Sequence, residues 1–590
     1  PQKPERNCTV VIMIQTRGNN NAVNSSFDPY CVRTMWRSIF AFLGLLLIVC
    51  VSRAQDQVGE VNDLYPAHAD HIRIPEHSAP SFDQRTAELD DILREQNGAL
   101  RLYGRFLPIE VSTTSHGAWG TLANGDKVWR IRIRSSEALA TELFFRNVQL
   151  AEEARLDVFD VGGEQHFGGY TQNDIGQDGS FSTPMVYGGT CIVTYSGPSL
   201  RTNVEAFTIS ALSHAYRDIV QEKSGSCEVD VNCSEGVGYE TVRDAVVRIR
   251  VVVPAGTGRC SGTLMNNTDL DCKPYVLTAM HCGDGSTEDN FNNYQFFFNY
   301  QRSDCSGSDG ALDQVVTGCL KRAGSNDIDA NGRAQGSDFM LLEMNGQVPA
   351  EFDAYFAGWD ATGSTVNAGR CIHHPDGDVK KVSSFSTQTY TAVWGTTLPD
   401  THWRVAWTGT ANGHGVTEPG SSGASLVNTS KRVIGTLTGG FSCCTLSACG
   451  TMTGPNQPDY FGKFSQHWTG NLNPANEKLN FWLAPNSTAL TLDGSYDPCG
   501  AIGIEELVHD VDPQVFPNPA TDHITVSWPM ELAGIDRVVV LDLTGRIVHS
   551  SSTGNRSSLE LNVANWAPGT YVIALEERGL RVSGSRLAVR

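Results

Sequence analysis

Three short motifs carry residue types that together can form a nucleophilic catalytic site, and they occur in the order His, Asp, Ser. His281 ends an apolar stretch, Asp338 begins another, and Ser422 lies in a turn rich in glycine and serine. In such a site the serine hydroxyl attacks a carbonyl carbon, the imidazole takes its proton and the carboxylate orients the imidazole. The motifs therefore predict hydrolysis through an acyl-enzyme, a reaction that requires no metal or organic cofactor.

The turn around Ser422 reads Glu-Pro-Gly-Ser-Ser-Gly over residues 418–423, so Ser421 is a rival nucleophile. The glycines permit a sharp turn, and the N–H groups of Gly420 and Ser422 can point at one developing oxyanion. Ser422 completes this pair of donors because it stands two residues after Gly420. A loop rich in Gly and Ser is otherwise only a loop, so the assignment depends on the other two motifs.

Apolar strands are expected to hold the other two side chains. The stretch 275–280 ends at His281, and Cys282 can tie that turn to Cys260. The stretch 339–344 would bury Asp338 at its head, where the carboxylate can accept the imidazole N–H. A single histidine is usually structural, and an aspartate before a strand is commonly a turn residue. All three motifs in this order, each beside an apolar strand, favour catalysis.

The composition indicates a loop-rich β protein of several domains. A chain of 590 residues is too long for one hydrophobic core. Glycine accounts for 58 residues and charged residues for only 18%, which suits β structure better than helical bundles. The 65 acidic and 44 basic residues give a net charge of −21. Nucleic acid and anionic membrane are disfavoured as partners, since both are bound mainly through Lys and Arg.

The cysteines indicate disulfide bonds formed outside the cytosol. Twelve of the 16 lie between Cys227 and Cys499. Metal ligation is the alternative, but the paired C-x-x-C groups with neighbouring histidines that a zinc site would use are missing. We expect disulfides.

The N-terminal segment has the pattern of a signal peptide over residues 35–54. Arg37 precedes an apolar run at 39–51, and cleavage is expected after Ala54. A membrane anchor is the alternative, but a span needs about 20 apolar residues. Residues 1–34 lack an initiating Met and have the character of upstream translation, so Met35 is the expected start.

Residues 55–223 form an acidic unit with one cysteine, Cys191, and without a recognisable catalytic motif. Its clearest strand is 129–134, which would place Trp129, Ile131 and Ile133 on one face and three arginines on the other. We interpret the unit as a β-rich propeptide, with a carbohydrate-binding module as the alternative. Lys223 precedes the cysteine-dense region, and an enzyme that cuts after lysine could cut there itself.

The C-terminal segment 513–590 predicts a small β-sandwich after a linker at 501–512. It begins with Val-Phe-Pro-Asn-Pro-Ala-Thr-Asp at 515–522 and continues with apolar alternation between Gly and Pro turns. It closely resembles the C-terminal sorting domain of bacterial type IX secretion cargo. The resemblance implies the secretion machinery as a partner, a secreted or cell-surface location and removal of the domain. A fibronectin-like adhesive module is the alternative.

Residues 224–500 are expected to form the protease domain, and over 224–498 the sequence resembles the lysyl endopeptidases of the Achromobacter protease I type, which are trypsin-like serine proteases. The matching motifs are Cys-Ser-Gly-Thr-Leu at 260–264, Leu-Thr-Ala-Met-His-Cys at 277–282, Ile-His-His-Pro at 372–375 and Val-Thr-Glu-Pro-Gly-Ser-Ser-Gly at 416–423. The resemblance implies a double β-barrel. It assigns the catalytic triad to His281, Asp338 and Ser422, the residues already chosen on chemical grounds.

The resemblance also implies a pocket for lysine. Asp459 matches the family's aspartate at the base of the specificity pocket, and Gly439 and Gly440 would leave the pocket wall open. A solvated loop aspartate is the alternative. Thr438 departs from the family, whose prototype has a histidine there. Two further departures, Ala424-Ser425 after the catalytic glycine and Phe461 in place of Tyr, remove no catalytic atom.

Three disulfides are implied by the same resemblance. They are Cys260–Cys282, Cys233–Cys305, and Cys227 with Cys443 or Cys444. Six other cysteines of this region, including Cys272, Cys319 and Cys371, have no partner that the sequence assigns.

The expected fold is mostly β: a trypsin-like double β-barrel preceded by a β-rich propeptide and followed by a small sandwich. The expected function is a secreted endopeptidase, a monomer, that cleaves protein substrates on the carboxyl side of lysine. Asp459 alone does not separate lysine from arginine, so a trypsin-like enzyme that also accepts arginine is one alternative. A non-catalytic protease homologue acting as an adhesin is the other, although it predicts loss of a triad residue.

Overall fold

The computed structural model describes residues 74–96, 98–176, 178–217, 223–325, 336–395, 397–445, 453–499, 513–529, 535–542, 547–554, 556–577 and 580–590. The expected signal peptide with Ala54, the start at Met35 and the linker 501–512 lie outside these ranges. β-strands dominate the described residues, as expected, and their helices are short: α2 (Gln84–Gln96), α3 (Glu240–Ala245), α4 (Glu288–Phe291) and α5 (Leu479–Leu483). None of the described helices is long and apolar enough to cross a membrane.

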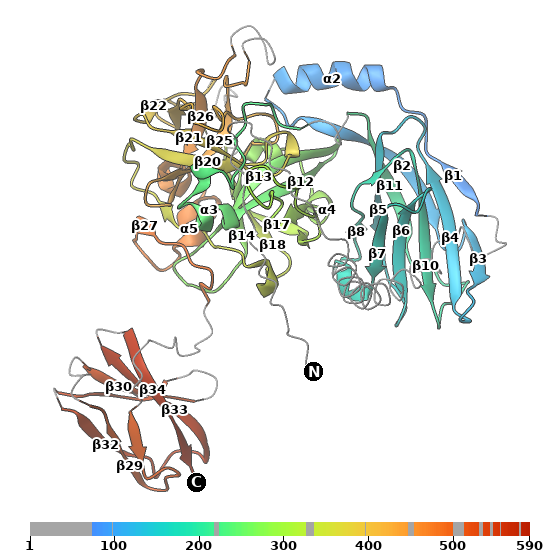
Figure 1. The fold of residues 1–590 in the computed structure, drawn as a ribbon. Helices are drawn as coiled ribbons and strands as arrows, with labels where there is room; N and C mark the ends of the chain where they lie inside the picture. Colours follow the sequence, from blue (N-terminus) through green and yellow to red (C-terminus); the bar gives the residue numbers. More distant parts are fainter. Residues whose placement is uncertain are drawn as a thin grey trace, which may run out of the picture.

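The N-terminal region, residues 74–217, is built from two β-sheets that enclose a core around Trp129, Phe145 and Phe207 (Figure 1). The predicted strand at 129–134 is present as part of β4. Its Arg130 is buried, whereas Arg134 is exposed, so the arginine face is not uniformly solvated. One sheet contains β1 (Glu76–Ser78), β3 (Ala118–Thr121), β4 (Lys127–Arg134), β6 (Arg155–Asp160), β7 (His166–Tyr170) and β10 (Thr190–Gly197).

The second sheet of this region continues into the cysteine-rich region. Its N-terminal strands are β2 (Leu102–Ser112), β5 (Ala140–Arg146), β8 (Phe181–Ser182), β9 (Val186–Tyr187) and β11 (Thr208–Ala215). β2 pairs antiparallel with β13, with Arg105 opposite Gly256 and Leu102 opposite Gly258. Gly104 is required there, because a Cβ atom would lie 2.3 Å from Ser213 Oγ. The N-terminal region is therefore joined to the protease region through backbone pairing.

The first half of the protease region supplies the remaining strands of that shared sheet. They are β12 (Val246–Val253), β13 (Gly256–Met265), β14 (Tyr275–Thr278), β15 (Gln295–Phe297), β16 (Val315–Thr317), β17 (Cys319–Gly324) and β18 (Met340–Met344). Their apolar side chains, including Ile249, Val276 and Leu342, pack into one core. β14 pairs with β18, so the ends of these two strands lie side by side.

The second half forms a sheet of its own, and the two halves together correspond to the expected double barrel. The strands are β19 (Trp359–Asp360), β20 (Gly369–His373), β21 (Lys381–Phe385), β22 (Tyr390–Ala392), β23 (His402–Val405), β24 (Ser425–Asn428), β25 (Val433–Gly440), β26 (Asp459–Lys463) and β27 (Thr491–Leu492). Trp403, Trp407 and Phe461 lie in its core.

The C-terminal region is a small sandwich of two sheets, as expected. One sheet holds β28 (Gln514–Phe516), β29 (His523–Ser527) and β32 (Ser558–Asn562); the other holds β30 (Arg537–Asp542), β31 (Ile547–Ser552), β33 (Gly569–Glu577) and β34 (Leu580–Val589). Ile524, Val540 and Leu587 are buried between the two sheets. The region therefore has its own hydrophobic core.

Candidate active site

His281 and Asp338 form a hydrogen-bonded pair at the adjacent ends of β14 and β18. His281 Nδ1 donates to Asp338 Oδ2 at 2.7 Å, and the His281 backbone N–H donates to Asp338 Oδ1 at 3.0 Å. The register, with Thr278 opposite Met340, brings these strand ends together. Asp338 has a φ of 58°, a left-handed conformation that aspartate tolerates better than most residues. The carboxylate thus fixes the imidazole, and no hydrogen bond joins its Nε2 to any described residue.

Two opposing effects act on the pKa of the His281 imidazole. Burial lowers its pKa, whereas the charge of Asp338 and the hydrogen bond to it raise it, and the pKa lies above the ordinary value. The side chains of His281 and Asp338 are 19% and 16% exposed, so the pair can meet a substrate. An imidazole stabilised as imidazolium by a carboxylate is what a general base in acyl transfer requires.

The turn that carries Ser422 lies against the end of β14. The Ser422 carbonyl accepts the Ser261 N–H at 2.9 Å and lies 3.8 Å from the Sγ of Cys282, the neighbour of His281. Gly423 has a φ of 85°, and a Cβ atom there would lie 2.1 Å from Thr278 Oγ1. Only glycine at position 423 allows the serine turn to lie this close to β14, the strand that precedes His281.

The two serines of the turn have different surroundings. Ser421 is fully buried, its Oγ lies 2.7 Å from His373 Nδ1, and it accepts the Glu418 N–H at 3.1 Å. Ser422 is half-buried. Ser421 is therefore engaged in the protein interior, and the geometry favours Ser422 as the nucleophile.

The proposed oxyanion donors lie in the same turn. Gly420 has a φ of 91°, and its carbonyl accepts the Ser261 hydroxyl at 2.9 Å, which fixes the orientation of the turn. Within the described residues, neither the Gly420 nor the Ser422 N–H donates a hydrogen bond to the protein. Both donors therefore remain available for a substrate oxygen.

Asp459 is fully buried at the start of β26. Its Oδ2 accepts hydrogen bonds from Trp407 Nε1 at 2.6 Å, from Thr417 Oγ1 at 2.8 Å and from the Ser442 hydroxyl. Its Oδ1 accepts the Ser442 N–H at 3.0 Å, the one hydrogen bond that the described residues give this oxygen. Burial raises the pKa of Asp459, although these donors oppose the rise. This environment is that of an anchored interior carboxylate and does not match the solvated loop alternative.

Gly440 packs directly against the buried carboxylate. It stands opposite Asp459 in the pairing of β25 with β26, and a Cβ atom at Gly440 would lie 1.8 Å from Asp459 Oδ1. A bulge at Thr438 precedes the two glycines. A side chain at position 440 would therefore collide with Asp459 Oδ1, and glycine lets the two strands approach there.

Two residues beside Thr438 and Gly439 were not selected as site residues from the sequence. Trp394 lies against Gly439, where a Cβ atom would be 3.1 Å from the indole, and its ring is 5.1 Å from the Tyr460 ring. His402 Nε2 lies 3.1 Å from Thr438 Oγ1. Motifs alone gave no reason to select Trp394, because it comes from a short edge region that meets the glycines only through folding.

The disulfides agree with the implied pairs and add one. Cys260–Cys282 and Cys233–Cys305 are present, and Cys227 pairs with Cys444 rather than with Cys443. Cys443 is itself disulfide-bonded. Cys272, for which the sequence assigned no partner, pairs with Cys499. Among the described cysteines, Cys191, Cys319 and Cys371 are free and buried, and burial raises the pKa of each.

The two sheets with a His–Asp pair beside a serine turn are the arrangement expected of a trypsin-like serine protease. The resemblance to a particular family within that class is also confirmed, since residues 221–462 match the family "Lysyl endopeptidase, C-terminal domain". Residues 514–589 match the "Secretion system C-terminal sorting domain", which indicates secretion of the chain.

A curated relative supports the same resemblance. The lysyl endopeptidase of Pseudomonas aeruginosa is 30% identical over 314 residues. The match covers 50% of this chain and 62% of the relative, so the chain spans about three fifths of that protein's length.

Solved protease structures resemble the chain more distantly. The protease Anisep from Arthrobacter nicotinovorans is 17% identical with a TM-score of 0.28, and covers 38% of this chain and 91% of its own. The thermostable serine protease AL20 from an extremophilic microorganism is 11% identical with a TM-score of 0.26, with the same coverage. Likenesses at this level do not bear on substrate or mechanism.

Proposed function

We propose that the protein is a secreted serine endopeptidase that hydrolyses peptide bonds on the carboxyl side of lysine, with His281, Asp338 and Ser422 as its catalytic residues. The observation that carries the proposal is the His281–Asp338 pair, with its 2.7 Å hydrogen bond, beside the half-buried Ser422 turn. The family match over residues 221–462 supports it.

The mechanism follows from these groups. Ser422 Oγ attacks the scissile carbonyl while His281 Nε2 takes its proton, and Asp338 stabilises the imidazolium that forms. The N–H groups of Gly420 and Ser422 stabilise the negative charge on the substrate oxygen. His281 then gives its proton to the leaving amine, and water, activated by the same imidazole, hydrolyses the acyl-enzyme.

Lysine specificity is assigned to Asp459 with Thr438, Gly439 and Gly440. A lysine side chain passing the two glycines would bring its ammonium to Asp459 Oδ1. The oxygen has capacity for that bond because, within the described part of the chain, it accepts one hydrogen bond. A compact ammonium suits a single free oxygen, whereas the fork of an arginine guanidinium pairs best with both oxygens of a carboxylate.

The flanking regions fit a secreted precursor. Residues 55–223 are proposed as a propeptide, 224–500 as the enzyme and 513–590 as a domain read by the type IX secretion machinery. The processed enzyme is expected to be a monomer whose partners are its lysine-containing substrates. Lys223 is 58% exposed, which makes it accessible for cleavage.

The test uses peptides that differ only in Lys, Arg or Leu before the scissile bond, with the processed wild type and a Ser422→Ala variant. Cleavage confined to lysine and abolished in the variant is the expected result. Equal cleavage after arginine would contradict the assigned specificity but not the catalytic residues. A correctly processed wild type that cleaves none of the peptides would favour the adhesin alternative.

A further inference from the structure

His467 is a fully buried histidine that the proposed mechanism does not use. It lies in the short helical segment η6 (Gln466–Gly470), which follows β26 in the second half of the protease region. Its Nδ1 lies 2.7 Å from the hydroxyl of Ser337, which is also buried, and its Nε2 lies 3.2 Å from Thr436 Oγ1. Burial lowers the pKa of His467 well below its ordinary value, and the nearby His402 lowers it further. Both nitrogens of a neutral ring are therefore engaged.

The imidazole of His467 contacts both residues that flank Asp338. Ser337 precedes Asp338 and is hydrogen-bonded to the ring, whereas Phe339 follows it, with its ring centroid 4.6 Å from that of His467. Asp338 itself has the left-handed φ of 58°, a conformation that the surrounding contacts must maintain. A shift of either flanking residue would therefore move the carboxylate that binds the His281 imidazole.

The backbone of Ser337 also packs against β26. A Cβ atom on Gly462 would lie 1.8 Å from the Ser337 carbonyl oxygen and 2.8 Å from Cε1 of His467, so only glycine fits there. The first half holds the same segment as well, because Ser325 Oγ accepts the Phe339 N–H at 3.0 Å. The short segment that carries the catalytic carboxylate is thus held by both halves of the protease region.

The second ring nitrogen of His467 reaches the strand beside the serine turn. Its partner Thr436 lies in β25, and the neighbouring Leu437 carbonyl accepts the Gly423 N–H at 3.0 Å. Gly423 follows Ser422 directly. One imidazole therefore connects the segment of the catalytic carboxylate to the strand that holds the proposed nucleophile.

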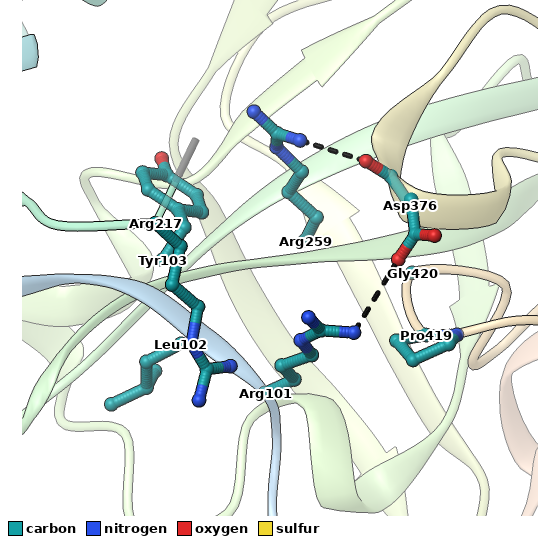
Figure 2. A pocket seen from close by; sticks show the side chains of 8 residues that line it. All are labelled: Arg101, Leu102, Tyr103, Arg217, Arg259, Asp376, Pro419 and Gly420. Atoms are coloured by element: carbon teal, nitrogen blue, oxygen red, sulfur yellow. Dashed lines mark hydrogen bonds and ion pairs between the residues drawn. The ribbon is translucent and has the colours of Figure 1, made fainter. Parts of the chain in front are cut away.

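A second set of contacts near the serine turn involves the N-terminal region. Asp376 lies beside Gly420 in Figure 2, where its carbonyl accepts a hydrogen bond from Arg259 at 2.7 Å and its carboxylate lies 3.6 Å from Arg101. Arg101 belongs to the segment that is expected to leave on processing. The contacts of His467 lie within the protease region, so they would remain in the processed enzyme.

We propose that His467 is a positioning residue for the reaction, which holds the Asp338 carboxylate in place against His281. It acts through Ser337 and Phe339, and its second nitrogen aligns the His–Asp pair with the strand of the serine turn. The inference rests on the proposed function, because it gives His467 a role toward the general base. The role is indirect, so His467 is not a catalytic residue.

Two substitutions separate the roles of the two ring nitrogens. His467→Asn keeps a polar group at the position of Nδ1, toward Ser337, whereas His467→Gln keeps one at the position of Nε2, toward Thr436. With the processed enzyme and a lysyl peptide, kcat should fall on the order of 10- to 100-fold in His467→Gln with KM nearly unchanged, because a misplaced base impairs the chemical step. His467→Asn should keep most of kcat. Ser337→Ala removes the same hydrogen bond from the other side and should lower kcat in the same direction.

The pH profile distinguishes positioning from a loss of packing. The pKa of His281 is raised by Asp338, with a weaker contribution from Asp284. A displaced carboxylate raises it less, so the acid-limb midpoint of kcat/KM should move to lower pH by about one unit in His467→Gln. In His467→Asn the midpoint should stay where it is. Equal losses of kcat in the two His467 variants with an unchanged midpoint would make His467 a packing residue and overturn the inference.

An NMR titration of His281 in the Ser422→Ala precursor separates this inference from the proposed function. The matched control is His214→Gln in the N-terminal region. His214 is also buried, with its Nδ1 2.8 Å from Ser135 Oγ and its ring centroid 4.2 Å from that of Phe82. The control therefore removes the same kind of contacts at a site remote from the His–Asp pair.

A His281 pKa that is lowered in His467→Gln, but not in His467→Asn or the His214→Gln control, would support the inference even if the wild type cleaved no lysyl bond. A His281 pKa that is the same in the precursor with His467, in His467→Gln and in the control would overturn the inference while leaving the proposed protease activity intact.

Discussion

The two halves of the protease region differ in whether their β-sheet includes strands from the N-terminal region. The first half, β12–β18, shares its sheet with the N-terminal region through β2 and β13, whereas the second half, β19–β27, has a sheet of its own. Arg250 on β12 illustrates the dependence. Its buried guanidinium bonds to the Thr183 carbonyl at 2.9 Å and lies 3.5 Å from Glu142 Oε1, both in the N-terminal region.

The difference separates two tasks. The first half, which carries the proposed general base and its orienting carboxylate, is supported by a segment expected to leave. The second half, which carries the proposed nucleophile and specificity carboxylate, is supported by its own sheet. Mutations in the second half should therefore have the same effect whether or not the N-terminal region is still attached. Mutations at the shared sheet should matter mainly in the precursor.

The sharpest difference is expected between the two adjacent serines of the second half. Ser422→Ala should lower kcat on the order of 10⁶-fold, because the nucleophile is lost while the fold is kept. Ser421→Ala removes the hydroxyl that contacts His373 and Glu418. It should cost about 1 to 3 kcal/mol of unfolding free energy and leave most activity. Steady-state kinetics and urea denaturation of both variants measure these effects; loss of turnover in Ser421→Ala alone would reverse the assignment.

A second large effect is expected at Asp459. Asp459→Asn keeps the size of the side chain but removes the charge that would pair with a substrate ammonium. Loss of one partner of a desolvated pair costs about 3 to 5 kcal/mol, so kcat/KM for lysyl substrates should fall on the order of 10² to 10⁴-fold. Asp493→Asn is the matched control, because Asp493 is 77% exposed in an ion pair with Arg432. Equal losses in the two variants would argue against a specificity role.

The sequence was informative where function depends on local pattern. His281, Asp338 and Ser422 could be chosen because each lies at the edge of an apolar strand or a glycine turn, features that a few neighbouring residues determine. The pairing of β2 with β13 could not be predicted from the sequence. It joins segments about 150 residues apart, and the glycines at the contact give no alternating apolar pattern. The Cys272–Cys499 disulfide could not be predicted either, because its two cysteines are 227 residues apart in the sequence. Cys443 and Cys444 are adjacent, so spacing could not choose between them.

The shared sheet itself can be tested through Glu142. The side chain is buried, accepts the Tyr103 hydroxyl at 2.9 Å and faces Arg250. Glu142→Ala would leave Arg250 buried without its ionic partner, and should lower the unfolding free energy of the precursor by about 3 kcal/mol. The processed enzyme, which is expected to lack residue 142, provides the internal reference.

Glu110→Ala is the surface control for that experiment. Glu110 pairs with Arg146 at 2.7 Å, but the two side chains are 68% and 52% exposed, so the expected loss is below about 1 kcal/mol. A Glu142→Ala precursor as stable as the Glu110→Ala precursor would show that the N-terminal region does not support the first half through this pair.

The smallest expected effect is a displacement of the acid limb of the pH profile, and it also distinguishes the two halves. His281 in the first half has its pKa raised above 6.5 by Asp338, against the effect of burial. In the second half, burial lowers the pKa of His373 to about 3 and that of His402 to about 4. Of these three histidines, His281 is therefore the one whose pKa is raised and not lowered by its surroundings.

Because the base must be neutral, kcat/KM should rise with pH through the His281 pKa, with its midpoint above 6.5. In Asp338→Asn the residual activity should show a midpoint at lower pH, since the carboxylate that favours the imidazolium is gone. His402→Gln should leave the midpoint where it is. The folded-state pKa of His281 is raised, so its stabilising bond to Asp338 is fully present below the unfolded pKa and weakens as the pH rises through the folded one. If the midpoint of the pH profile moved in His402→Gln and not in Asp338→Asn, the group whose titration limits activity would lie in the second half and not in the first.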